Sequence, residues 1–148
     1  MTSARSPHIR QIAAVAGAVL LGPALAWAGT TETLSVTVAS GDFSSWSIDG
    51  TPDPPLTLVR GRTYVLDLTG VPAFHPFNIN TINTTGNGNR YNSGVTNNGA
   101  TGETDITFIV PNDAPDTLHY NCGNHGAMNG PITIISEEVP IFKDGFEP

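Results

Sequence analysis

Three soft ligand types lie within seven residues near the C-terminal end of the chain. Cys122 is the only cysteine, His125 follows three residues later, and Met128 follows after three more. A thiolate, an imidazole and a thioether this close together form a mixed sulfur and nitrogen donor set, which suits copper better than a hard cation. The spacing therefore predicts a site for a soft metal ion in this loop.

A copper ion that exchanges single electrons is held by two imidazoles and one thiolate in a plane, with a weak axial thioether. The loop supplies one imidazole, so the second must come from another part of the chain. Besides His125, only His75 and His119 follow residue 28. Side chains alternate along a strand, so His119 points away from the face that carries Cys122, and we expect it at the surface. His75, between Phe74 and Phe77, is the predicted second imidazole ligand.

Zinc is the alternative metal for this donor set. One cysteine and two histidines could hold Zn²⁺ with water in the fourth position. Methionine is a poor zinc ligand, so the presence of Met128 favours one copper ion. The predicted metal ligands are His75, Cys122, His125 and Met128.

The elements that must position these ligands are short strands. Apolar residues alternate with polar ones, turn residues separate the runs, and no helical period is present after residue 28. About seven or eight strands over roughly 105 residues predict an all-β sandwich or barrel. A loop rich in Gly and Asn spans 84–102, with a short ordered piece expected around Tyr91. Runs predicted as extended are 34–38, 43–48, 56–59, 64–68, 75–80, 104–110, 117–122 and 131–135.

The N-terminus has the pattern of a signal peptide. Two arginines precede an uncharged apolar run, and Ala26-Trp27-Ala28 supplies a small-x-small cleavage site. We expect a signal peptide over 1–28, one domain over 29–136 and a short tail over 137–148. Export would place the chain in the bacterial periplasm or outside the cell, with no membrane insertion after cleavage.

Charge restricts the partners. All 13 acidic residues follow residue 28, but only four of the six basic residues do, which leaves a formal charge of −9 there. Nucleic acid and anionic lipid are therefore poor partners, whereas a basic protein is compatible with this surface. A single cysteine in an exported protein cannot form an internal disulfide, and metal binding is one use that remains for it.

The pattern His75, then Cys122-x2-His125-x2-Met128, resembles the cupredoxin or type 1 blue copper family over nearly all of 34–135. The resemblance implies a cupredoxin-like Greek-key β-sandwich and one type 1 copper. It also implies that the two histidines, the cysteine and the axial methionine are the ligands. The implied function is that of a monomeric one-electron carrier, not an enzyme. Its partner would be a redox protein such as a basic c-type cytochrome, a reductase or an oxidase.

One position departs from the family pattern. Many cupredoxins place Asn or Ser after the first histidine, where its backbone N–H donates to the cysteine sulfur. Here the residue is Pro76, which has no N–H. Several family members have proline two residues after the cysteine, where this chain has Asn124. We therefore predict that the donor to the Cys122 sulfur has moved to the backbone of Asn124.

Three other functions use the same residues differently. A copper carrier or buffer would need the same ligands without electron shuttling. A multicopper enzyme would need further histidine motifs that this chain lacks, although a small mononuclear enzyme stays open if Met128 is not bound. A metal-free interaction module would leave the coincidence of Cys, His and Met unexplained.

Overall fold

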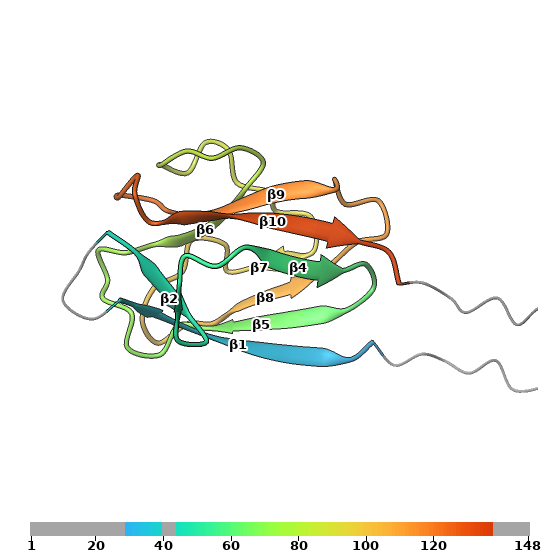
Figure 1. Ribbon diagram of the computed structural model, residues 1–148, viewed down its shortest axis with the longest axis horizontal. Coiled ribbons are helices and arrows are strands. Elements are labelled where there is room, and N and C mark those ends of the chain that lie inside the picture. Colours follow the sequence, from blue (N-terminus) through green and yellow to red (C-terminus); the bar gives the residue numbers. More distant parts are fainter. Residues whose placement is uncertain (1–28, 40–43, 138–148) are drawn as a thin grey trace, which may run out of the picture.

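The computed structural model describes residues 29–39 and 44–137, which form ten strands packed as two sheets (Figure 1). The predicted signal peptide and residues 138–148 of the predicted tail lie outside the described residues. The described part contains no α-helix, and so no helical segment there could cross a membrane. The strands are β1 (Thr31–Val38), β2 (Trp46–Ile48), β3 (Thr51–Pro52), β4 (Leu56–Val59), β5 (Thr63–Asp67), β6 (Phe77–Asn80), β7 (Val95–Thr96), β8 (Ile106–Ile109), β9 (Thr117–Cys122) and β10 (Asn129–Ile135).

The two sheets are mixed. The larger has the order β3-β2-β1-β5-β8-β7, and the smaller has the order β4-β10-β9-β6. β1 pairs with β5 in parallel, as does β4 with β10, while the other pairs are antiparallel. The predicted all-β sandwich is confirmed. The strand number exceeds the expected seven or eight because β3 and β7 have only two residues each, too few for an alternating pattern to be visible in the sequence.

Arg60-Gly61-Arg62 joins two of the runs predicted as extended, 56–59 and 64–68. Both strands are present, but they belong to different sheets: β4 pairs with β10, whereas β5 pairs with β1 and β8. The turn is bonded to both sheets, because Arg60 N–H donates to Ile135 O (2.9 Å) and Gly61 N–H donates to Val110 O (2.8 Å). It is therefore a crossing from one layer of the sandwich to the other.

The core lies between the two sheets and is built from the side chains of each strand that point toward the other sheet. Trp46, Phe77, Phe108 and Tyr120 are its largest fully buried side chains, and the Phe77 and Tyr120 rings stack with centroids 5.5 Å apart. The ordered piece expected near Tyr91 is present. Asn80 and Arg90 form an isolated bridge, and the Tyr91 ring packs edge-on against Phe108.

The absence of a side chain at Gly130 on β10 leaves room for the Tyr120 ring. The two residues pair across β9 and β10, and a Cβ at position 130 would collide with the Tyr120 ring and hydroxyl. That ring cannot move away easily, because its hydroxyl donates to Pro54 O (2.7 Å). We expect Gly130→Ala to lower the free energy of unfolding of the metal-free protein by about 1–3 kcal/mol, as overpacking of a filled core does.

Urea denaturation followed by tryptophan fluorescence measures this loss. Gly88→Ala is the matched control, since a Cβ at exposed Gly88 would have no heavy atom within 4 Å. Equal unfolding midpoints for the two variants would contradict the expectation.

Candidate metal centre

The pairing of β6 with β9 brings His75 to the cysteine. In this antiparallel pair, Phe77 at the start of β6 lies opposite Cys122 at the end of β9. His75 lies two residues before Phe77, and Gly123 N–H donates to Pro76 O (2.8 Å) just beyond the last strand pair. The register therefore fixes the histidine beside the sulfur although 47 positions separate them in sequence.

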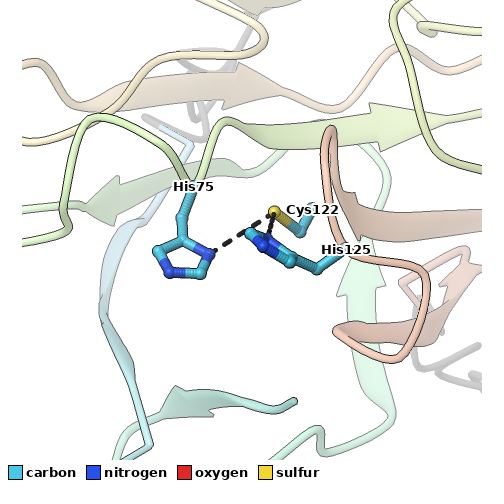
Figure 2. A group of neighbouring side chains, drawn as sticks. All are labelled: His75, Cys122 and His125. Carbon is cyan, nitrogen blue, oxygen red and sulfur yellow. Dashed lines mark hydrogen bonds between the residues drawn. The ribbon is translucent and has the colours of Figure 1, made fainter. Parts of the chain in front are cut away.

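Three predicted ligands converge at this end of the sandwich (Figure 2). The Cys122 Sγ lies 3.3 Å from His125 Nδ1 and 3.7 Å from His75 Nδ1. The ligand atoms of the three residues all lie within 4.8 Å of one another. Figure 2 shows both imidazoles beside the sulfur, each linked to it through Nδ1. One metal ion could contact all three atoms.

Met128 closes the loop that carries two of these residues. The Cys122 N–H donates to Met128 O (2.8 Å), and the Met128 N–H donates to His125 O (3.3 Å). The Met128 side chain is fully buried. The predicted axial residue is thus bonded through its backbone to both neighbouring ligands, while binding by its sulfur stays a prediction.

The site is buried on one side and open on the other. His75 and Cys122 are fully buried, whereas His125 is partly exposed. Burial, and to a smaller extent the neighbouring His125, lower the pKa of His75. Its imidazole is therefore neutral at neutral pH, which is the form that binds metal. The half-exposed Phe74 ring covers His75, with centroids 4.3 Å apart.

His119 is outside this group, as the alternation along β9 predicted. It pairs with Asn80 on one side and with Pro131 on the other. It is partly buried, so the expectation of a surface residue was too simple. β9 is an inner strand of the smaller sheet, between β10 and the edge strand β6, so His119 has a neighbouring strand on each side.

The predicted donor to the sulfur is present at Asn124. Its backbone N–H donates to Cys122 Sγ at 3.5 Å, which confirms the prediction that residue 124 supplies the donor that Pro76 lacks. Its side chain also donates to Phe74 O (2.8 Å), a contact that the sequence did not indicate. Asn124 therefore ties the loop before His75 to the loop after Cys122, in addition to bonding the sulfur.

The donor set fits a single type 1 copper. Two imidazole Nδ1 atoms and one thiolate converge, and a buried methionine belongs to the same loop. A zinc site of catalytic type would need only the three converging residues and a water. The buried methionine and the N–H bond to the sulfur favour copper, because softness and covalency of the thiolate matter most for that metal.

No family model matches the chain, and no curated protein matches it. Solved structures that share its architecture include two of rusticyanin. The copper protein rusticyanin aligns with a TM-score of 0.52 at 20% identity, covering 72% of this chain and 79% of that chain. A substituted rusticyanin aligns with a TM-score of 0.50 at 19% identity, covering 74% and 80% of the two chains. The chain therefore has the cupredoxin β-sandwich fold, and the likeness suggested by its sequence is confirmed at that level.

Proposed function

We propose that this protein is a type 1 copper protein that carries single electrons, exported to the periplasm or secreted. The observation that supports this most is the convergence of His75 Nδ1, Cys122 Sγ and His125 Nδ1 at one end of a cupredoxin sandwich. Copper bound there supplies a one-electron couple. The protein acts as a carrier and not as an enzyme.

Each residue has a separate role in this proposal. The His75 and His125 imidazoles would hold the metal through Nδ1, with the Cys122 thiolate as the strong ligand and the Met128 thioether as a weak one. Buried groups on β6 and β9 hold His75 and Cys122 in place, so that little rearranges when the charge at the site changes. The partly exposed edge of His125 is the shortest way from the site to a partner.

The partner is a basic redox protein, such as a c-type cytochrome, a reductase or an oxidase. The chain after residue 28 has a formal charge of −9, and opposite charge speeds encounter without requiring tight binding. The protein acts as a monomer.

Copper retention during redox cycling tests this function. The protein is loaded with one equivalent of Cu(II) and is then reduced and reoxidised repeatedly in the presence of a Cu(I) chelator. A carrier of electrons keeps its copper through these cycles. Transfer of copper to the chelator on the first reduction would instead identify a copper carrier or buffer, and would contradict the proposal.

The Asn124 backbone bond makes a separate prediction about the reduction potential. An N–H near the sulfur favours the state with more negative charge there, which is the reduced one. Asn124→Pro removes this N–H, and so we expect a lower potential. If the bond contributes roughly 1 kcal/mol, the decrease is about 40 mV for a one-electron couple.

Asn124→Ala is the matched control for that variant. It retains the backbone N–H and loses only the side-chain bond to Phe74 O. Protein-film voltammetry compares the two. An unchanged potential in the proline variant, or an equal decrease in both variants, would show that the backbone bond does not tune the site.

A further inference from the structure

The outer face of the smaller sheet contains buried asparagines where a solvent face is expected. Along β6 the side chains alternate, and Phe77 and Ile79 enter the core. Asn78 and Asn80 point the other way, yet both are fully buried, and Asn121 beside them on β9 is 1% exposed. Burying an amide is costly unless it is hydrogen-bonded. These side chains must therefore be bonded to something that covers this face.

The cover is the loop that follows β6, and the bonds form a continuous chain of four asparagines, which we call the asparagine clamp (Asn80, Asn121, Asn83 and Asn129). Asn80 Nδ2 donates to Asn121 Oδ1 (3.2 Å), and Asn121 Nδ2 donates to Asn83 Oδ1 (2.6 Å). Asn83 Nδ2 then donates to Asn129 Oδ1 (2.9 Å). The clamp thus runs from β6 through β9 and the loop to the start of β10.

The clamp ends on the metal-ligand loop. Asn129 Nδ2 donates to Gly126 O (2.9 Å) and Ala127 O (3.1 Å). These two carbonyls lie between His125 and Met128 in sequence. Because carbonyls only accept, they fix the direction of every amide behind them: each Nδ2 points toward the ligand loop and each Oδ1 points away from it.

A second connection holds the other end of the same loop. Gly86 N–H donates to Gly123 O (2.8 Å), and Asn78 Nδ2 donates to Gly86 O (2.8 Å). The segment 83–86 therefore bonds the ligand loop directly just after Cys122, and it reaches the carbonyls just after His125 through the Asn129 side chain. Both connections end on backbone groups that flank the ligands and not on the ligands themselves.

We propose that the asparagine clamp is a positioning device, which fixes the 123–127 backbone and with it His125 before any metal binds. The role of the clamp in metal binding rests on the proposed copper function, whereas the hydrogen bonds of the clamp do not depend on it. Apolar side chains on the outer face of β6 could be buried under the loop without the cost of burying polar amides. The asparagines are therefore explained by the hydrogen bonds that they make to the metal-ligand loop. Asn83, Asn121 and Asn129 are positioning residues in this account, acting through the loop backbone.

Asn83→Asp tests the clamp at its exposed middle. Aspartate still accepts the hydrogen bond from Asn121 Nδ2. It has no N–H to donate to Asn129 Oδ1, so the bond between residues 83 and 129 is lost. Asn98→Asp is the matched control, with the same change of charge. Asn98 Nδ2 donates to Ile79 O (3.0 Å) and Tyr91 O (2.9 Å), and no bond of its side chain reaches residues 122–129 within the described part of the chain.

The first readout is amide hydrogen exchange in the metal-free protein. We expect Asn83→Asp to speed exchange at Cys122, Gly123 and Met128 by about tenfold, the equivalent of one net hydrogen bond. Asn98→Asp should leave these three amides at the wild-type rate. Wild-type exchange in Asn83→Asp, or equal acceleration in both variants, would overturn the proposal.

The second readout is copper release to a chelator. We expect release about tenfold faster from Asn83→Asp and unchanged from Asn98→Asp, with the visible spectrum of the wild type retained in both. Equal release from wild type and Asn83→Asp would overturn the link between clamp and metal. If wild-type protein takes up no copper at all, the proposed function fails, while the exchange measurement still decides whether the clamp positions the loop.

Discussion

Replacement of Cys122 by serine is expected to abolish the strong visible absorption of the copper-loaded protein. That absorption transfers charge from sulfur to copper, so an oxygen in its place cannot produce it. Loss of a residue that only hydrogen-bonds to a metal ligand lowers metal affinity by roughly 10–100-fold. Copper affinity should fall by more than this in Cys122→Ser, because a ligand itself is removed. Absorption spectroscopy and competition with a chelator measure the two effects.

The fold should survive this substitution. Serine is slightly smaller than cysteine, and its hydroxyl can still accept the Asn124 N–H that the sulfur accepts now. Asn98→Asp serves as the spectroscopic control, because the Asn98 side chain bonds Ile79, Tyr91 and Asn92 and none of the predicted ligands. A Cys122→Ser protein that keeps the colour of the wild type would show that the thiolate is not a ligand.

Replacement of Trp46 by alanine is expected to cause the largest loss of stability. Trp46 is fully buried, and its ring lies 4.9 Å from Phe77 and 6.1 Å from His75 between centroids. Removing it should lower the free energy of unfolding by about 3–5 kcal/mol, a large fraction of the roughly 5–15 kcal/mol of a typical domain. Chemical denaturation followed by circular dichroism measures the loss.

The same cavity should loosen His75, because Trp46 packs against its ring. Trp46→Phe is the control, since it keeps one aromatic ring and gives up the second ring of the indole with its Nε1, which has no hydrogen-bond partner among the described residues. We expect Trp46→Phe to retain most of the stability and the copper affinity. Equal denaturation midpoints for Trp46→Ala and wild type would contradict the role given to this ring.

The site was the most predictable part of the molecule. Cys122, His125 and Met128 are close in sequence, so their spacing alone indicates the chemistry. His75 could be selected because alternation on β9 excludes His119 from the cysteine face. Asn124 could be predicted as a donor because Pro76 lacks an N–H. The structure brings His75, Cys122 and His125 together, while their binding of metal stays a prediction.

The fold was predictable as a set of strands but not as a topology. β9 occupies the predicted range 117–122, since alternation and flanking turns mark both ends. The distribution of β4 and β5 between two sheets depends on partners such as β10 and β1, which are remote in sequence. Local turn residues at 60–62 fit a hairpin and a crossing equally well.

The asparagine clamp could not be found from the sequence. The pattern Phe-Asn-Ile-Asn over β6 is that of a strand with one apolar face and one solvent face. Only the position of the following loop converts the polar face into a buried one. A loop rich in Asn and Gly gives no local signal of where it packs, because these residues suit many turn conformations.

Titration of the wild-type protein with Cu(II), followed by visible absorption, tests the central claim most directly. The account predicts an intense thiolate-to-copper band that saturates at one equivalent, disappears on reduction and returns on reoxidation. A colourless protein that binds zinc as tightly as copper would contradict it.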